Sequence, residues 1–271
     1  MTTTLGFIGA GNMAGAIVRG VVRSGLVPAG QIGAFDPNDA ALQHLTEETG
    51  IVPFAGNLDL VADAATVVLA VKPHLVPGVL EQVGGLLQER KPLVVSIAAG
   101  VTLAHLEGWL SPATPIVRVM PNLNVAVGQG MAAVTANQAA TSDQVEQVLA
   151  LFRAVGQAIE VEERLFPAFT AIAGSSPAWT FLYIDALARG ALAAGMTKAQ
   201  AREAATQAVL GSAAMLAASS DHAWELIDRV SSPGGTTVAG LNALEAKGFS
   251  SAVIAAVQAT IAREAELRTG S

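Results

Sequence analysis

Residues 231–237, with the sequence SSPGGTT, bring four hydroxyl groups and two glycines together directly before a predicted helix. The N–H groups at a helix start have no partner inside the helix and point outward, so that an incoming group can reach them. Such a segment forms a nest for a small anion and suits a carboxylate. The alternative is a capped helix behind a glycine hinge, but this needs only one serine and one glycine. The repetition therefore favours a binding site.

A second motif lies near the start of the chain, where GFIGAGNMAG joins a predicted strand to a predicted helix. Gly9, Gly11 and Ala14 occupy the three positions of a G-x-G-x-x-G/A pattern. Gly9 permits the tight turn, Gly11 lets the backbone approach a pyrophosphate, and Ala14 lets helix and strand pack closely. The helix start also faces the negative charge of the ligand. This context favours dinucleotide binding over a purely structural turn.

The second predicted strand ends at FDPND, which places Asp36 where an acidic residue binds the ribose hydroxyls of NAD and repels the 2′-phosphate of NADP. The alternative is that Asp36 only starts the turn before Pro37, leaving Asn38 and backbone amides to hold a phosphate. No arginine lies near this loop. The chemistry of these residues leans towards NAD.

Three further strand ends carry candidate residues. Lys72 precedes Pro73, which fixes the chain as it leaves the sheet, and a lysine at the carboxyl end of a parallel strand lies where ligands bind. A solvated loop lysine is the equal alternative. The small residues of SIAAG, 96–100, suit close approach of a nicotinamide ring as well as plain packing. The segment RVMPN, 118–122, ends a further strand.

The residue types that the sequence lacks also limit the chemistry that the protein can perform. The chain has no cysteine, and its histidines show neither metal-ligand spacing nor a Ser-His-Asp order; they are His44, His74, His105 and His222. Lys198 and Lys247 lie near helix ends, outside any apolar helical face that would tune their pKa. We therefore expect no metal, and a reaction served by a hydroxyl donor instead of a strong base.

The composition excludes several classes of protein. A chain of 271 residues fits two domains or one large α/β domain, and with 52% hydrophobic and 14% charged residues it has apolar surface to spare for a subunit interface. The net charge of −7 and the 4% aromatic content argue against a nucleic-acid partner. No apolar run reaches the roughly 18 residues of a membrane span, and the first residues lack the basic segment of a signal peptide. We expect a cytoplasmic protein that acts on a small molecule.

The chain changes character near residue 162. Before it, apolar β-branched runs alternate with helix-like segments, as is typical of a parallel sheet covered on both faces. Glycines end two of these helices, at Gly25 and Gly50. After it, Ala- and Leu-rich segments predict helices only. The predicted fold class is an α/β Rossmann-like dinucleotide-binding domain over residues 1–162, followed by an all-α domain over residues 163–271.

One predicted helix, residues 176–195, is apolar on nearly all of its faces. Such a helix must be buried on every side, and a domain of about a hundred residues has room for few of them. We therefore expect this helix to pack against a partner subunit, which makes the second domain a dimerisation domain.

Six motifs resemble those of the pyrroline-5-carboxylate reductase family in order and approximate spacing: FIGAGNMA, AVKP, VSIAAGV, RVMPN, GSSPA and SSPGGTTVAGL. The resemblance covers essentially the whole chain, and the last motif is far more specific than the glycine turn. It implies an enzyme that reduces 1-pyrroline-5-carboxylate to L-proline with NADPH or NADH, the last step of proline biosynthesis. It also implies a helical domain that interlocks in a homodimer, with dimers assembling further, commonly to a decamer of five dimers.

The resemblance implies roles for single residues as well. In the SPGG segment, Ser232, Gly234, Gly235 and Thr236 bind the substrate carboxylate, while Thr237 hydrogen-bonds the imine nitrogen and is the catalytic residue. Asn57 contacts the cofactor, residues 70–73 line the nicotinamide, and residues 98–100 lie opposite. Together with the strand-end residues above, the predicted cofactor site comprises Gly9, Ala10, Gly11, Asn12, Met13, Ala14, Asp36, Asn38, Asn57, Ala70, Val71, Lys72, Pro73, Ala98, Ala99 and Gly100.

The predicted chemistry fits these residues, because hydride addition to C=N needs a hydrogen-bond donor at nitrogen and no metal. Arg229 and Asp221 stand near the SPGG segment without an assigned role. A β-hydroxy-acid dehydrogenase would need a basic residue in the helical core, and none is found. A related imine reductase or a non-catalytic nucleotide-sensing subunit would not need the full SSPGGTT segment.

Overall fold

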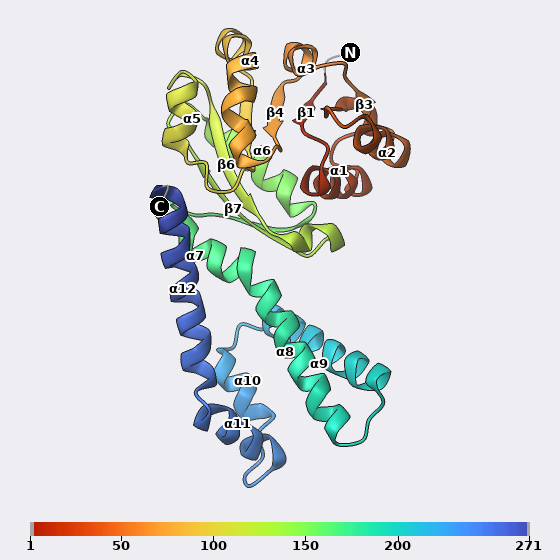
Figure 1. Ribbon diagram of the computed structural model, residues 1–271, viewed down its shortest axis with the longest axis vertical. Helices are drawn as coiled ribbons and strands as arrows, with labels where there is room; N and C mark the ends of the chain where they lie inside the picture. The colour runs from red at the N-terminus through yellow and green to blue at the C-terminus, as the bar shows by residue number, and fades with distance from the viewer. Residues whose placement is uncertain (1–2, 270–271) are drawn as a thin grey trace. The chain divides into compact units, whose positions relative to one another are not determined.

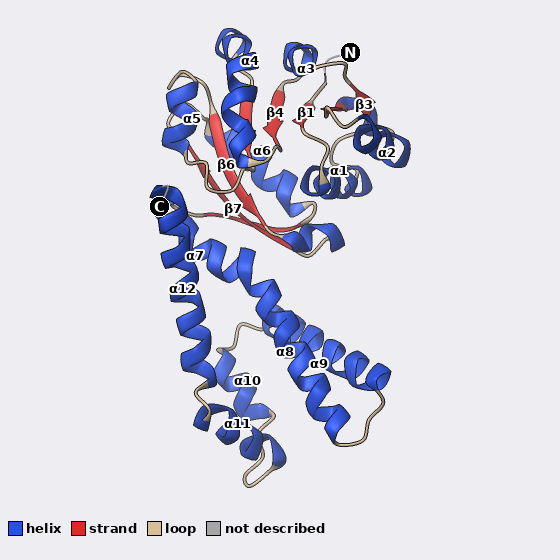
Figure 2. Ribbon diagram, in the orientation of Figure 1, coloured by secondary structure: helices blue, strands red, loops and turns tan. Residues whose placement is uncertain are grey.

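The computed structural model describes residues 3–269 (Figure 1). Up to Leu165 it alternates strands with helices, and the later described residues form helices only (Figure 2). The strands are β1 (Leu5–Ile8), β2 (Ile32–Phe35), β3 (Val52–Pro53), β4 (Thr66–Leu69), β5 (Leu93–Ser96), β6 (Ile116–Pro121), β7 (Gly130–Ala136) and β8 (Gly156–Glu160). The helices among them are α1 (Asn12–Ser24), α2 (Asp39–Thr49), α3 (Asn57–Asp63), α4 (Val76–Arg90), α5 (Leu103–Trp109) and α6 (Ser142–Arg153).

Short 3₁₀ turns connect these elements: η1 (Ala29–Gln31), η2 (Pro73–Leu75), η3 (Leu123–Val127) and η4 (Glu163–Leu165). The helix ends at Gly25 and Gly50 are confirmed. Both glycines adopt the left-handed conformation, with φ of 72° and 74°, and stop α1 and α2 respectively.

The eight strands form one sheet in the order β3-β2-β1-β4-β5-β6-β7-β8. Every neighbouring pair is parallel except β6 and β7, which are antiparallel. The predicted parallel sheet is confirmed for the other pairs, and this antiparallel pair is the departure from it. The connection between them, residues 122–129, is too short for a crossover, which takes a dozen or more residues.

Helices cover both faces of the sheet, as predicted. On one face α1, α2 and α6 pack against alternate strand residues around Phe7, Ile17 and Phe152, each of which is at most 1% exposed. On the other face α3, α4 and α5 pack against the intervening residues around Leu60 and Leu87. Because helices cover the apolar side chains on both faces of the sheet, a ligand can bind only at the strand ends and their loops.

The contacts divide the chain into two compact units. The first, here called the sheet unit, runs up to Gly174 and includes the end of α12 from Arg263; the second, the helical unit, is Ser175–Ala262. The helices after η4 are α7 (Phe166–Phe169), the π-helical turn η5 (Thr170–Ser175), α8 (Ser176–Ala193), α9 (Lys198–Ala218), α10 (Ala223–Arg229), α11 (Thr236–Ala246) and α12 (Phe249–Thr269). The predicted division after residue 162 follows composition, and it stays a prediction.

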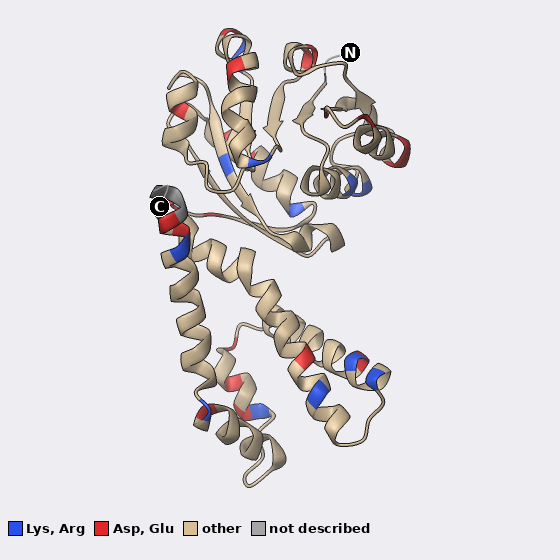
Figure 3. Cartoon of the chain, viewed as in Figure 1, with Lys and Arg blue, Asp and Glu red and all other residues tan. Residues whose placement is uncertain are grey.

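The helical unit leaves most of its apolar side chains on the surface. In α8 no residue is buried, and Phe181 and Leu182 are 59% and 70% exposed. In α9 only Ala201 and Ala205 are buried. Figure 3 shows few charged residues along α8 and along α12 before its last turns. Within one chain, therefore, the apolar helix predicted to be buried on every side is exposed.

The carboxylate of Asp63, at the end of α3, ties the segment before β1 to this helix. Its Oδ2 accepts hydrogen bonds from the Thr3 hydroxyl at 2.6 Å and from the Thr3 N–H at 2.9 Å. These bonds, the hydroxyl's foremost, hold the pKa of Asp63 below its ordinary value of 3.8. A lowered pKa in the folded state stabilises the fold above about pH 4, and this contribution is lost as the pH falls through the folded value.

We therefore expect Asp63→Asn to unfold at lower urea concentration than the unchanged protein near neutral pH. The difference should shrink as the pH is lowered below about 4, because the carboxyl then takes up a proton in both states. Urea unfolding followed by circular dichroism over this pH range measures it. Asp59→Asn, on the same helix, makes the same charge change at an exposed residue and serves as the control. A difference that is independent of pH would contradict the assignment.

Candidate active site

Three loops of the predicted cofactor site begin side by side at one edge of the sheet. The last residues of β1, β4 and β5 are paired in register, Ile8 with Leu69 and Leu69 with Ser96. The chain order reverses between β1 and β4, since β2 and β3 lie on one side and β5 and β6 on the other. Ligands of open α/β sheets bind in the crevice at such a reversal.

The glycine turn after β1 has the geometry that its residues predict. Gly9 has a φ of +105°, and a Cβ at this position would lie 2.7 Å from the carbonyl oxygen of Ala70. A Cβ on Gly11 would meet no atom within 4 Å, so the space in front of this residue is open. Gly11 caps α1 without any side-chain hydrogen bond, and the first N–H groups of the helix, on Asn12, Met13 and Ala14, face outward. The turn can therefore hold a pyrophosphate.

The loop after β2 is tied to this turn. The carboxylate of Asp36 accepts the N–H of Ala10 at 2.7 Å and the N–H of Asn38 at 2.8 Å. The Asn38 side chain caps α2 by accepting the N–H of Ala41 at 3.3 Å. Asp36 thus forms the turn before α2, which was one of the two interpretations of this residue. Each of its carboxylate oxygens still has a free lone pair. The N–H of Ala10 is occupied by Asp36.

Asn57, at the first position of α3, has one satisfied and one unsatisfied polar atom. Its Nδ2 donates to Oε1 of Gln82 at 2.8 Å. Its Oδ1 is buried and has no hydrogen-bond partner among the described residues, although the residue is only 8% exposed. A buried unpaired oxygen is costly, and a bound ligand that donates to it would remove this cost. This position therefore fits the predicted cofactor. Gln82 of α4, which orients Asn57, was not predicted from the sequence.

The loops after β4 and β5 differ in how firmly they are held. Lys72 is exposed and makes no ion pair within the described chain, so neither of its two interpretations is decided. Pro73 opens η2, and Val71 and Ala70 are half-buried beside the glycine turn. In the β5 loop the buried Ser96 hydroxyl accepts the N–H of Ala98 at 3.4 Å, while Ala99 and Gly100 are exposed. These last two can reach a ligand.

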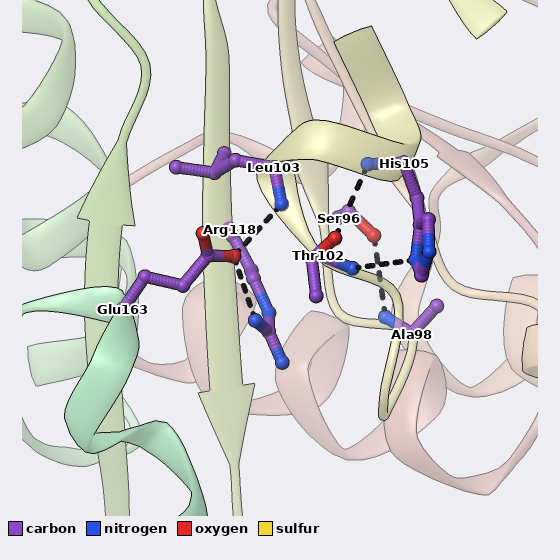
Figure 4. Close-up of polar contacts among 7 residues, drawn as sticks. All are labelled: Ser96, Ala98, Thr102, Leu103, His105, Arg118 and Glu163. Atoms are coloured by element: carbon purple, nitrogen blue, oxygen red, sulfur yellow. Dashed lines mark hydrogen bonds and ion pairs between the residues drawn. The ribbon is translucent and has the colours of Figure 1, made fainter. Parts of the chain in front are cut away.

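A buried ion pair fixes the helix that follows the β5 loop (Figure 4). Arg118 of β6 is 2% exposed, and its Nη1 lies 2.7 Å from Oε1 of Glu163. The same oxygen accepts the N–H of Leu103, the first residue of α5, at 2.7 Å. The guanidinium also lies 4.5 Å from the ring centre of Phe166. Arg118 thus positions the start of α5 through its ion pair with Glu163.

Sequence reasoning missed Glu163, because it lies 45 residues from Arg118. The only signal is that a charged residue in a strand buried on both faces requires a partner of opposite charge. Asn122 has a similar place: it accepts the N–H of Met131 at 3.0 Å and donates to the carbonyl of Ala173 at 2.9 Å. Both ends of the RVMPN segment therefore hold the sheet unit together.

In the helical unit, the SPGG loop (residues 231–237) forms a tight turn directly before α11. The N–H of Gly235 donates to the carbonyl of Ser232 at 2.9 Å, and Gly234 has a φ of +69°. Pro233 followed by a glycine with positive φ is the signature of a type II turn. A Cβ on Gly235 would lie 2.9 Å from the backbone carbonyl oxygen of Ser232, so this turn favours glycine there.

The turn leaves a set of polar groups without partners. Gly235 caps α11 without a side-chain hydrogen bond, which leaves the N–H groups of Thr236 and Thr237 facing outward. Within the described chain, the hydroxyls of Ser232, Thr236 and Thr237 have no hydrogen-bond partner. Ser231 differs, because its hydroxyl donates to the carbonyl of Ile227 at 2.7 Å and ends α10. The loop therefore combines N–H donors and hydroxyls suited to a carboxylate.

Arg229 and Asp221, which had no assigned role, are partners. The guanidinium of Arg229 lies 2.6 Å from the carboxylate of Asp221. This pair joins the exposed Arg229 at the end of α10 to the half-buried Asp221 before it, and it neutralises the arginine next to the SPGG loop. Over residues 3–269, no three acidic or histidine side chains gather as a metal ion would require, and no helix is long and apolar enough to cross a membrane.

The chain is similar to known proteins over nearly its whole length. Residues 163–267 match the family model described as pyrroline-5-carboxylate reductase dimerisation, and residues 4–100 match that of NADP oxidoreductase coenzyme F420-dependent. It is 40% identical to a pyrroline-5-carboxylate reductase of Glycine max, over 97% of this chain and 96% of that protein. A reductase of the same name from Coxiella burnetii superposes with a TM-score of 0.94 at 36% identity, covering 98% and 99% of the two chains. A Plasmodium falciparum pyrroline carboxylate reductase with NADP bound gives 0.85 at 28% identity, covering 97% of each.

The ion pair of Arg118 makes a prediction about stability. Glu163→Ala removes the carboxylate that contacts the buried guanidinium, and we expect a loss of about 3 kcal/mol in the free energy of unfolding. Glu163→Gln keeps both hydrogen bonds in place and should cost less. Glu162→Ala removes the neighbouring exposed pair with Arg164 and should change the free energy by less than about 1 kcal/mol. Chemical unfolding measures all three, and equal effects of Glu162→Ala and Glu163→Ala would contradict the assignment.

Proposed function

The chain belongs to the pyrroline-5-carboxylate reductase family, and we propose that its SPGG loop binds the carboxylate of 1-pyrroline-5-carboxylate. The protein is an NAD(P)H-dependent oxidoreductase that reduces the C=N bond of this substrate to give L-proline, in proline biosynthesis. The observation that carries the substrate site is the start of α11, where three hydroxyls and the first helical N–H groups have no partner. These groups can donate to both oxygens of a carboxylate.

We propose that Ser232, Gly234, Gly235 and Thr236 hold the carboxylate, and that Thr237 lies under the ring nitrogen. When a hydride adds to the imine carbon, the electron pair of the C=N bond moves to nitrogen, which must then be protonated or hydrogen-bonded. The Thr237 hydroxyl can donate to it, because the structure commits this hydroxyl to no other acceptor. The chain needs no strong base for this step.

The nicotinamide cofactor supplies the hydride when it is bound. We propose that the N–H groups of residues 11–14 hold its pyrophosphate and that Asn57 contacts it through the unpaired Oδ1. Residues 70–73 and 98–100 would then line the nicotinamide, positioned by β4, by Ser96 and by the ion pair of Arg118. These residues orient the cofactor and exclude water; the redox chemistry belongs to the cofactor.

The helical part matches a dimerisation family, which supports an oligomer. We propose that this oligomer is a homodimer in which the exposed apolar side chains of α8 are covered by the same surface of a second copy. The decamer of five dimers and the cytoplasmic location stay predictions of the sequence.

The activity is tested by the initial rates of NADH and NADPH oxidation with 1-pyrroline-5-carboxylate. We expect turnover by the unchanged protein, and a loss of roughly 100- to 10,000-fold in Thr237→Ala, the range for a lost proton donor. Thr237→Ser keeps the hydroxyl and should retain most of the rate. Thr206→Ala, which removes an exposed threonine hydroxyl bonded within α9, is the matched control. Full activity of Thr237→Ala would remove this residue from the mechanism.

The dimer is tested by Leu182→Asp, because Leu182 is the most exposed apolar residue of α8. In a two-fold dimer the substitution acts twice, and the loss of two buried leucines at roughly 1.5 to 3 kcal/mol each raises the dissociation constant by about 100- to 10,000-fold. Light scattering during size-exclusion chromatography over a dilution series measures it. Leu26→Asp, an exposed leucine of the sheet unit, is the control. An unchanged dimer would place the interface elsewhere.

A further inference from the structure

The carboxylate that follows β2 is held in one orientation by the backbone. Oδ2 of Asp36 accepts the N–H of Ala10, and Oδ1 accepts the N–H of Asn38, at 2.7 and 2.8 Å. One bond comes from the glycine turn and the other from the loop that leads into α2, so both sides of the carboxylate are fixed. A carboxylate has about four lone-pair positions, and these bonds use two of them. Two acceptor positions stay available to a ligand at this loop.

The charge of Asp36 has no cation beside it. Within the described chain Asp36 forms no ion pair, and the segment from Phe35 to Gln43 contains a second acid, Asp39, and no basic residue. Two basic residues of the neighbouring helices α1 and α2 belong to another pair, since Arg19 contacts Glu48 at 2.7 Å and His44 lies 3.8 Å from the same carboxylate. The loop is therefore negative, and nothing in it would neutralise an incoming phosphate.

Hydrogen bonds within this loop also occupy N–H donors that a phosphate would need. An N–H at the start of α2 would serve a phosphate well, because helix starts attract anions. In this chain the N–H of Asn38 is taken by Asp36, and the N–H of Ala41 is taken by the Asn38 side chain. The side chains of Asp36 and Asn38 thus occupy two backbone donors of this loop that a phosphate could otherwise use.

We infer that Asp36 makes this enzyme select NADH over NADPH. Its free lone pairs accept the hydroxyls of the adenosine ribose, and its charge repels a phosphate at the 2′ position. Because the same carboxylate holds Ala10, cofactor selection is coupled to the geometry of the glycine turn. The inference rests on the proposed function only in requiring that a nicotinamide dinucleotide binds.

The test is the binding of NADH and of NADPH to the full-length chain without substrate, by fluorescence titration. We expect NADH to bind roughly 10- to 100-fold more tightly, the factor that a hydrogen bond to a charged group provides. Asp36→Ser removes the charge and frees both N–H groups, so the ratio of the two dissociation constants should fall by a similar factor. Asp36→Asn keeps the size of the side chain and loses the charge, and it should lower the ratio in the same direction.

Asp39→Asn is the matched control, because it makes the same charge change at an exposed residue three positions further along the loop. Its ratio should stay within about threefold of the unchanged protein, the effect of a screened surface charge. Asp36→Ser is expected to weaken both cofactors somewhat, since Ala10 loses its anchor, and the ratio is therefore the deciding quantity.

Three results would overturn the inference: NADPH binding as tightly as NADH to the unchanged protein, a ratio unaffected by both Asp36 variants, or an equal shift in Asp39→Asn. No binding of either cofactor to the folded protein would overturn it together with the dinucleotide part of the proposed function. Selective binding of NADH without turnover of 1-pyrroline-5-carboxylate would support the inference and refute the substrate assignment alone.

Discussion

The carboxyl ends of β1, β4 and β5 lie at the same level of the sheet, and the cofactor site depends on this register. Ile8, Leu69 and Ser96 are paired side by side, so the three loops that follow them must start together. Gly9 then approaches the carbonyl of Ala70 too closely for any side chain. A shift of one residue in one of these strands would turn each of its side chains to the opposite face of the sheet and would move its loop away from the other two. The helices that pack on both faces oppose such a shift. The packing of the sheet and the position of the loops are therefore one constraint.

The helical unit buries much less of its apolar surface than the sheet unit does. The sheet unit buries large side chains on both faces of its strands, whereas α8 buries none and α9 buries only two alanines. Burial of apolar surface is the main source of stability, and in a single chain the helical unit has little of the buried apolar core that the sheet unit has. Its match to a dimerisation family accounts for this difference. The SPGG loop, with which we associate the substrate, thus belongs to the part of the chain whose own core is weakest.

Local signals in the sequence predicted much of this structure, and pairings between distant residues limited the rest. Gly25 and Gly50 stop helices because a left-handed residue ends a helix wherever it occurs. The direction of β7 was not visible, since an apolar run reads the same in both directions. Arg118 looked like any strand-end residue until its partner Glu163 was placed beside it. Apolar periodicity reports burial, and it does not report which charged residues meet.

Hydrogen-bond satisfaction separates the residues that build the proposed sites from those that would bind. Ser231 donates to the backbone and ends a helix, while the adjacent Ser232 has a free hydroxyl. Asn57 satisfies its amide nitrogen with Gln82 and leaves its buried oxygen unpaired. Buried polar groups are nearly always satisfied, because each exception costs free energy. The Asn57 oxygen and the hydroxyls of the SPGG loop are unpaired at positions predicted to bind a ligand, whereas the buried Thr114 hydroxyl is unpaired outside any predicted site.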